Sequence, residues 1–378
     1  MTDWTEQMPC VGGIAEQTLQ LIPKAHGVVC IIDHTGGVVA LGASADMRSW
    51  SADRLGPAAE GAKDLRSASA QVRWVRCGSL FESDLMFLGA AAELDPLLHR
   101  TVQRKLAVWW IGIDPMADAP RWSYTDEPER IGAGVVHLGP FPDRASAKGH
   151  AEWLDDRFEL CRFPDELARA PRGKPCLYKD MNRCPAACDG SEPIAEYRGR
   201  LRRALGFRRA DISVLQDRLV DEMQQASQAQ DFDRAARVKQ TLETLDAMDS
   251  PALEALRGLD EHAWAAVTRS ERSRTARVLA LAHGRWQRVG DIEVLTGGGA
   301  GFGELAAEAR RVIDGLANGP GVGDVGVLGV LGRALMKPSR SGLVFVHRDE
   351  ISGSSLLLAA ERVTRINRSG KGSRGKGS

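Results

Sequence analysis

Four cysteines near the middle of the chain constrain its fold more than any other feature. Cys176, Cys184 and Cys188 form a C-x7-C-x3-C run within KPCLYKDMNRCPAAC, and fourteen residues separate this run from Cys161. A chain without a secretory signal has little use for disulfides. Four thiols this close in sequence, two of them one helical turn apart, are better explained by one shared metal centre.

The spacing alone leaves the kind of metal open. Tetrahedral thiolate sites suit zinc or an iron–sulfur cluster. Zinc ribbons usually carry two short C-x2–4-C knuckles. The gaps here are longer and unequal, which favours ligands to the four irons of an iron–sulfur cluster. The plainer alternative is a group of unrelated buried cysteines. Cys30 and Cys77 fall in apolar strand-like runs, where we expect core thiols.

Bulk composition predicts an ordinary multidomain globular chain. The 378 residues predict two to four domains, and the 43% of apolar residues are enough for real cores. The formal net charge is zero, so no general electrostatic attraction to nucleic acid is expected. No run of eighteen apolar residues and no cleavable leader is seen, so we expect a cytoplasmic protein without a membrane span.

Two amphipathic helices are predicted over Asp211–Met248. One stripe repeats every three to four residues through Ile212, Leu215, Leu219, Met223 and Ala226, and a second runs through Phe232, Ala235, Ala236, Leu242 and Leu245. Gln228–Gln230 forms a short break, and Asp231 is placed to cap the second helix. Such a pair forms an antiparallel hairpin that docks on another hairpin or, alternatively, packs on its own domain.

The first hundred residues predict a small α/β unit. Val28–Ile32 and Val38–Leu41 are separated by the turn residues DHTGG, which favours a β-hairpin. Gln71–Val75 alternates as a third strand would, and Phe81–Leu98 has helical periodicity.

The middle of the chain gives fewer signals. We expect a strand at Val108–Ile113, a loop over Asp114–Glu129, and a helix over Asp143–Phe158 capped by its first residue. Trp153 and Phe158 are expected to pack the cysteine-containing domain.

The last third predicts a further α/β domain. Trp264–Val267, Val278–Leu281 and Trp286–Val294 are expected strands, and Leu305–Leu316 an expected helix.

Two glycine-rich stretches lie in this last third. Gly297–Gly303 lacks the Gly-Lys-Ser/Thr of a phosphate loop and is expected to be a flexible connector, and Asn318–Gly332 is expected to be a loop. The tail Arg362–Ser378 has six Lys or Arg and no acid, so we expect it to be disordered, either touching nucleic-acid phosphate or only solubilising the chain.

The cysteine run and the stretch DFDRAARVKQTLETL together resemble the UvrC family, the nuclease component of the bacterial excinuclease ABC in nucleotide excision repair. The resemblance extends more weakly from about Pro23 to about Gly315. It implies a [4Fe–4S] cluster, with zinc as the alternative, held by Cys161, Cys176, Cys184 and Cys188. The family's RNase H-like nuclease and helix–hairpin–helix repeats are expected to be absent from this shorter chain.

DFDRAARVKQTLETL resembles the UVR motif, which pairs UvrC with UvrB in the excinuclease. The resemblance implies a partner that is UvrB or a similar UVR-containing protein, with DNA as a further possibility. The residues implied at or near the contact are Phe232, Ala235, Ala236 and Arg237.

The order of elements in the first hundred residues resembles a GIY-YIG nuclease domain that has lost most of its motif. The family's two tyrosines fall on Val29 and Ala40, a lysine on Ala43, and the glutamate that binds the metal on Gly89, while the arginine is kept as Arg48. Glu82 and Glu93 are the nearest carboxylates, although the register could slip.

Phosphodiester cleavage needs an activated water, a metal and a route for the leaving-group proton. Arg48 alone leaves charge stabilisation without activation of the nucleophile or placement of a metal. The segment also carries eight Lys or Arg against twelve Asp or Glu, whereas a nuclease face is expected to be basic.

The sequence therefore predicts an α+β multidomain protein. The predicted parts are a degenerate GIY-YIG-like domain (1–100), a connector with the cysteine cluster (101–205), a UVR hairpin (206–250), an α/β domain (251–361) and a basic tail (362–378).

The function that these features imply is a repair-associated scaffold, connected with the SOS response, that binds DNA or a partner and has an impaired nuclease. A working divalent-metal DNA endonuclease, with magnesium as cofactor, is one alternative. A UVR-hairpin stress adaptor is the other.

Overall fold

The computed structural model describes residue 4 and residues 6–11, 16–56, 65–128, 134–248, 254–294, 301–337 and 342–365. The chain divides into two compact units. Unit 1 comprises Met1–Ala107, His262–Leu331 and Ser339–Ser378, and unit 2 comprises Val108–Glu261 and Gly332–Pro338. The predicted five-part division itself stays a prediction.

Unit 1 contains a first antiparallel sheet in the order β1-β4-β2-β3. Its strands are β1 (Glu6–Pro9), β2 (Gly27–Ile32), β3 (Val38–Ser44) and β4 (Gln71–Arg76). The predicted hairpin is confirmed: Asp33 Oδ1 accepts hydrogen bonds from the amides of Thr35 and Gly37, which closes the β2–β3 turn. Cys30 and Cys77 are buried as expected.

The helices of this half are α1 (Glu16–Leu19), α2 (Met47–Leu55), α3 (Leu80–Leu94) and α4 (Pro96–Leu106). The single helix predicted over Phe81–Leu98 is wrong in one respect, because the chain breaks at Asp95. The Asp95 side chain accepts from the Leu98 amide and caps α4, and Pro96 occupies the first turn, where its missing N–H costs nothing.

A second antiparallel sheet in unit 1 has the order β11-β10-β9-β12. It is built from β9 (Ala263–Arg269), β10 (Thr275–Ala282), β11 (Arg285–Glu293) and β12 (Leu343–His347), which confirms the three predicted strands. Helices α12 (Phe302–Ala317) and α14 (Gly353–Arg365) pack against it, and the predicted helix at Leu305–Leu316 lies within α12.

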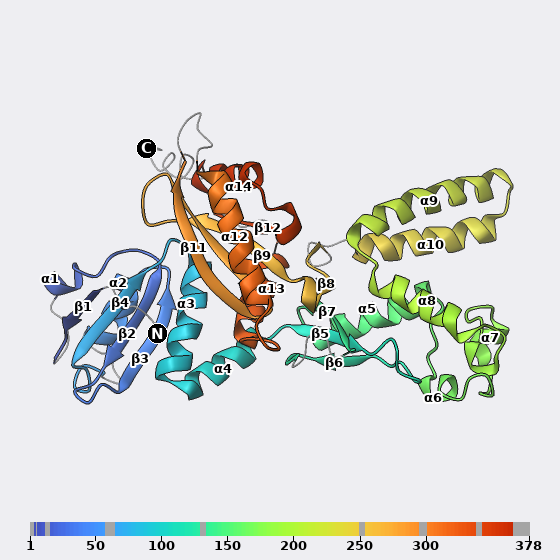
Figure 1. Cartoon of the computed structure of the whole chain (residues 1–378), viewed down its shortest axis with the longest axis horizontal. Coiled ribbons are helices and arrows are strands. Elements are labelled where there is room, and N and C mark those ends of the chain that lie inside the picture. Colours follow the sequence, from blue (N-terminus) through green and yellow to red (C-terminus); the bar gives the residue numbers. More distant parts are fainter. Residues whose placement is uncertain are drawn as a thin grey trace, which may run out of the picture. The chain divides into compact units, whose positions relative to one another are not determined.

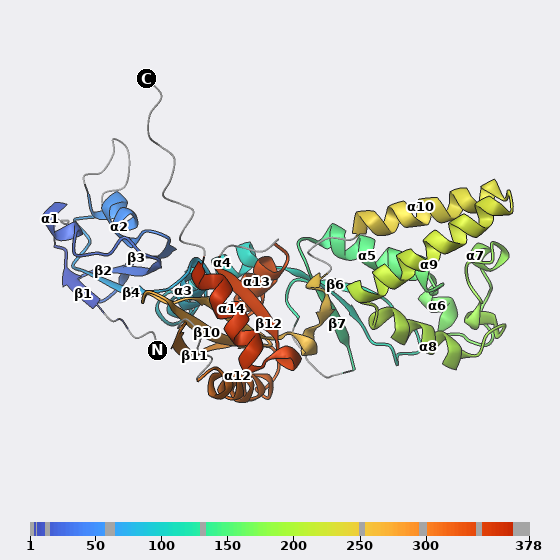
Figure 2. The same cartoon turned by 90° about the horizontal axis from the view of Figure 1, so that it is seen from above.

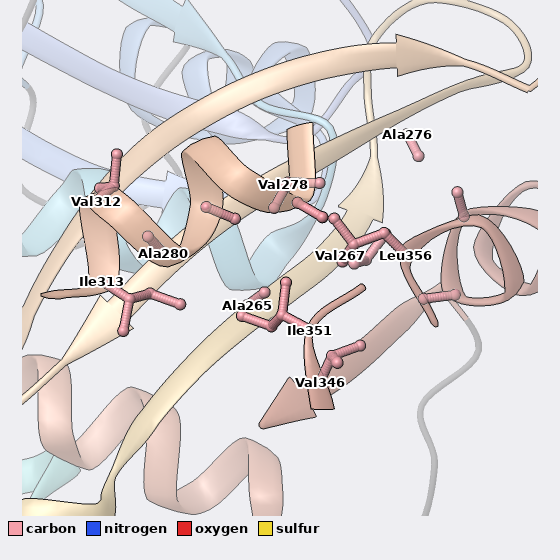
Figure 3. Close-up of a cluster of buried hydrophobic side chains, with 14 of the residues drawn as sticks. Ala265, Val267, Ala276, Val278, Ala280, Val312, Ile313, Val346, Ile351 and Leu356 are labelled. Atoms are coloured by element: carbon pink, nitrogen blue, oxygen red, sulfur yellow. The ribbon is translucent and has the colours of Figure 1, made fainter. Parts of the chain in front are cut away.

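The core under α12 and α14 follows from strand alternation. Figure 3 shows Ala276, Val278 and Ala280 of β10 together with Ala265 and Val267 of β9, and these side chains meet residues of α12 and of the α14 region. Successive side chains on a strand point to opposite faces. Arg277 therefore projects from the other face of β10.

Part of the predicted loop Asn318–Gly332 is helical instead. Helix α13 (Val325–Leu335) begins after Asp324, whose Oδ1 accepts from the Gly326 amide. Its glycines permit a close approach to α4: a Cβ at Gly329 would lie 2.4 Å from the Leu106 carbonyl oxygen. The glycines of this segment led to the prediction of a loop, because glycine lowers helix propensity. In the folded chain the same glycines allow close helix packing.

Unit 2 contains a small sheet in the order β6-β5-β7-β8. Its strands are β5 (Trp109–Ile113), β6 (Ser123–Thr125), β7 (Val136–Phe141) and β8 (Arg257–Gly258). Strand β6 lies inside the predicted loop Asp114–Glu129, so that prediction was incomplete. The sheet packs against α5 (Arg144–Arg157), where the Asp143 side chain caps the helix by accepting from the Ser146 amide.

Short helical elements follow α5, namely α6 (Pro164–Leu167), α7 (Leu177–Asp180), η1 (Ala187–Asp189) and α8 (Ile194–Leu205). Trp153 and Phe158 both contact the ring of Phe207 and pack the core of unit 2, as predicted.

The predicted helical hairpin is confirmed as α9 (Arg209–Gln228) and α10 (Phe232–Met248), which lie side by side in both views (Figures 1 and 2). Two further predictions are wrong at one end each, because Phe302 and Gly303 already belong to α12 and residues 362–365 still belong to α14. Residues 297–300 and all of the tail after Arg365 lie outside the described residues. No helix in the described ranges is both long enough and apolar enough to cross a membrane.

Candidate functional site

The four central cysteines lie in the loops and short helices between α5 and α8. Cys161 follows α5, Cys176 immediately precedes α7, Cys184 lies between α7 and η1, and Cys188 lies within η1. None is in a disulfide. Cys184 and Cys188 are buried, whereas Cys161 and Cys176 are half-buried.

Backbone contacts hold these loops together. The Gly173 amide donates to the Cys188 carbonyl at 2.8 Å, and a Cβ at Gly173 would lie 2.3 Å from the Glu166 carbonyl oxygen. The Glu166 carboxylate accepts from the Lys174 amide at 2.8 Å. Only glycine at position 173 lets the segment before Cys176 approach the segment around Cys188 so closely.

The sulfurs are close enough to influence one another's charge. Burial first, and then the charges of Cys184, Cys188 and Cys176, raise the pKa of the Cys161 thiol to about 11. Burial also raises the pKa of Cys188, and Asp189, Cys184 and Cys176 add to that shift. A bound cation would reverse this pattern, because coordination favours the thiolate.

The electrostatic interaction among the four cysteines does not by itself show a preformed metal site. Across the described ranges, no three Cys, His, Asp or Glu side chains are arranged to hold a metal ion. The donor chemistry, four thiols from one set of loops, suits a soft metal or an iron–sulfur cluster. The assignment of Cys161, Cys176, Cys184 and Cys188 as ligands therefore stays a prediction.

The helical hairpin has a packed end and an open end. Leu215 of α9 and Leu245 of α10 are buried in the core of unit 2, and Leu219 packs against that core. At the other end, Asp231 caps α10 by accepting from the Arg234 amide at 3.0 Å, and Arg234 pairs with Glu222 of α9 at 2.7 Å. The hairpin is thus packed on its own domain only at its base.

The residues implied at the partner contact lie at the start of α10, near the open end. Phe232 is 68% exposed, Ala236 is exposed and Ala235 is half-buried. The backbone of Arg237 lies in α10, and its side chain lies outside the described part of the chain. An aromatic ring this exposed next to a capped turn is available to a partner.

Arg48, the arginine predicted to remain from a nuclease motif, is hydrogen-bonded to the local backbone. Its Nε donates to the Ile22 carbonyl oxygen and its Nη2 to the Gln20 carbonyl oxygen, both at 2.7 Å. Both contacts hold the segment before β2 against α2. Val29 is fully buried in β2, and Gly89 is exposed on α3 with nothing near the position of an added Cβ.

Glu82, one of the two glutamates nearest in sequence to Gly89, is engaged in ion pairs. It is completely buried, and its carboxylate pairs with Arg277 of β10 at 2.9 Å and with Arg288 of β11 at 2.5 Å. The Gly78 amide also donates to it at 2.8 Å.

Arg277 in turn pairs with Glu271 at 2.6 Å and Asp291 at 2.7 Å. No sequence pattern signalled this network, because Glu82 and Arg277 are 195 residues apart.

Two segments in the middle of the chain match known protein-family models. Residues 108–207 match the family model described as the UvrC/Cho excinuclease middle domain, and residues 213–247 match the UvrB/uvrC motif. The first match contains all four central cysteines, and the second covers most of the hairpin. These matches confirm the resemblance inferred from the cysteine run and from DFDRAARVKQTLETL.

Curated relatives named UvrABC system protein C align over about three fifths of the chain. The protein of Lactobacillus helveticus is 23% identical over 238 residues, which are 62% of this chain and 38% of that protein. That of Saccharopolyspora erythraea is 28% identical over 235 residues, which are 59% of this chain and 32% of that protein. The chain thus spans less than two fifths of the length of these relatives. No solved structure matches it.

Proposed function

We propose that this chain, a relative of the UvrC proteins through its middle domain and its UVR motif, acts in nucleotide excision repair as a partner-docking protein with an impaired nuclease segment. The observation that carries the proposal is the exposure of Phe232 at the open end of a hairpin whose base is packed. The partner is a second UVR hairpin, that of UvrB.

The physical argument starts from the hairpin itself. Two helices cannot bury both of their apolar stripes against each other, so a hairpin with exposed Phe232 and Val214 gains by docking. Aromatic anchors near the centre of an interface usually dominate its binding free energy. The ion pair between Arg234 and Glu222 and the cap at Asp231 hold the open end in shape before a partner arrives.

A binding experiment with the full chain tests the docking proposal. Immobilised chain is expected to retain purified UvrB, and Phe232→Ala is expected to release it. Leu97→Ala is the matched control, because Leu97 is 76% exposed but lies on α4, outside the hairpin. Equal retention by all three chains would contradict the proposal. Retention of another UVR-containing protein in place of UvrB would replace the repair function with that of a stress adaptor.

We also propose that Cys161, Cys176, Cys184 and Cys188 hold an iron–sulfur cluster. Support comes from four thiols gathered in one set of tightly packed loops and from the raised pKa values of Cys161 and Cys188, which a bound cation would relieve. Such a cluster would cross-link the loops between α5 and α8. The salt bridge between Lys179 and Asp189 at 2.5 Å lies beside Cys188 and would help to fix its loop.

The proposal that the nuclease is impaired is based on the side chains at the positions of the nuclease motif. Val29 and Ala40 cannot relay a proton, Gly89 cannot bind a cation, and Arg48 is bonded to two carbonyl groups. Glu82, a buried carboxylate on α3, is paired with Arg277 and Arg288. These contacts favour a binding role over the alternative of a divalent-metal endonuclease.

A further inference from the structure

A cavity of about 540 Å³ lies beside Cys161 in unit 2, between the β5–β6 hairpin, α5 and the loops that carry the cysteines. This volume is in the range of small-molecule sites. Every residue that lines it lies within the described part of unit 2. Cys161, a proposed cluster ligand, is one of its lining residues, whereas the helical hairpin contributes none.

The walls of the cavity combine aromatic faces with one carboxylate. Trp122, Tyr124 and Tyr178 are half-buried and line it. The Trp122 indole Nε1 donates to Asp155 Oδ1 at 2.7 Å, which fixes both side chains. Asp155 also lines the cavity, and the structure records no second hydrogen bond for this carboxylate among the described residues.

Two arginines and one carboxylate meet at the rim of the cavity. Arg162 and Arg183 both pair with Asp156, at 2.5 Å and 2.6 Å, so two guanidinium groups share one carboxylate. The Arg162 guanidinium also stacks over the Tyr178 ring, 4.4 Å from its centroid, which orients it. Asp155 lines the same cavity, so a phosphate bound here would compete with the carboxylates of Asp155 and Asp156 for the two guanidinium groups.

We propose that this cavity binds one unpaired nucleotide of a nucleic acid, with the base against Trp122, the base edge toward Asp155 and the phosphate at Arg162 and Arg183. Unpaired bases are typically recognised by stacking on aromatic rings and by hydrogen bonds to their edges. A carboxylate accepts hydrogen bonds from an exocyclic amino group. The site therefore prefers cytosine or adenine to thymine, which has no amino group.

This site is independent of the hairpin, so its test can fail while partner docking succeeds, and the reverse. The experiment titrates dCMP, dTMP and inorganic phosphate into the full chain by calorimetry. We expect dCMP to bind saturably with one site per chain, dTMP to bind more weakly, and inorganic phosphate to bind most weakly.

Single substitutions test the phosphate contact, the base-edge contact and the stacking contact separately. Arg183→Gln is expected to weaken dCMP binding about 10- to 100-fold, as the loss of a charged hydrogen bond does. The matched control is Arg202→Gln, because Arg202 is exposed on α8 and does not line the cavity. Asp155→Asn is expected to narrow the difference between dCMP and dTMP. Trp122→Phe keeps an aromatic face but removes the hydrogen bond to Asp155, and is expected to weaken dCMP binding less than Arg183→Gln.

Three results would overturn the proposal. The first is the absence of saturable dCMP binding by the wild-type chain. The second is equal weakening by Arg183→Gln and Arg202→Gln, which would indicate nonspecific charge. The third is inorganic phosphate binding as tightly as dCMP, which would leave an anion site without a base pocket. Iron content and far-UV circular dichroism of each variant verify that the neighbouring loops stay folded.

Discussion

Arg48 donates a hydrogen bond from its guanidinium Nε to the carbonyl oxygen of Ile22 at 2.7 Å. A second bond, from Nη2 to Gln20, uses the other side of the same group. The arginine predicted to remain from a nuclease motif is thereby hydrogen-bonded to two backbone carbonyl groups. Its role is to hold the segment before β2, and the loss of Arg48 should affect folding rather than chemistry.

Arg48→Ala is accordingly expected to lower the free energy of unfolding by about 1–3 kcal/mol, as the loss of hydrogen bonds from a charged donor does. Urea unfolding measures this, with Arg100→Ala on the exposed side of α4 as the control. The same samples should show no nicking of lesion-bearing duplex DNA with magnesium or manganese, with or without UvrB. Robust incision that Arg48→Ala abolishes would refute the impaired-nuclease account.

Replacing Glu82 is expected to be more costly. Glu82→Gln leaves Arg277 and Arg288 facing a neutral amide in a buried place, and removing one partner of a buried pair costs about 3–5 kcal/mol. The value should fall toward the lower end, because Arg277 keeps Glu271 and Asp291. Urea unfolding of Glu82→Gln is compared with Glu93→Gln, an exposed position on the same helix. Similar losses for the two variants would show that the network contributes little.

The same network gives unit 1 a pH dependence. Burial raises the pKa of Glu271 and of Asp291, but hydrogen bonds from Arg277 outweigh burial and lower both pKa values below their ordinary 4.5 and 3.8. A group whose pKa is lowered on folding contributes stability above its ordinary value and loses it as the pH falls toward the folded value.

The stability difference between wild type and Glu271→Gln should therefore be constant from pH 7 to pH 5. It should shrink as the pH falls through about 4.5 and below, where the unfolded carboxylate is already protonated. Urea midpoints at about pH 7, 5, 4 and 3 measure it across this window. A difference that persists unchanged at the acid end would mean that the carboxylate does not stabilise unit 1 through its charge.

Anaerobically purified chain is expected to contain iron and sulfide, and Cys184→Ser is expected to lose both and to unfold at lower urea. Cys10→Ala should leave the metal content unchanged, because Cys10 is a buried thiol of unit 1. Stoichiometric zinc without iron would replace the cluster with a zinc site. Chain that contains neither metal would refute a metal centre at these cysteines.

Sequence periodicity predicted the helices and strands whose signals lie within a single segment of the chain. The stripes of α9 and α10, the Asp231 cap and the alternation of β4 are visible in single segments, and the predicted hairpin, cap and strand were confirmed. Contacts between distant segments could not be predicted in this way. Nothing near Glu82 in sequence indicates Arg277, and the glycines of α13 favour a loop until Leu106 is seen against them.

The nucleotide-sized cavity was missed for the same reason. Trp122 lies in a segment predicted to be a loop, Asp155 on a predicted helix, and Arg183 in the cysteine run. Only the folded chain brings these three side chains around one space. An isolated tryptophan between prolines and charged residues was the single signal along the chain.

The dissociation constant of UvrB for the full chain and for Phe232→Ala tests the central claim most directly. Removing a hot-spot aromatic anchor usually costs about 1–3 kcal/mol, so the account predicts about 5- to 150-fold weaker binding by Phe232→Ala. Leu97→Ala should bind as the wild type does. Equal dissociation constants for the wild type and Phe232→Ala would contradict docking through the open end of the hairpin.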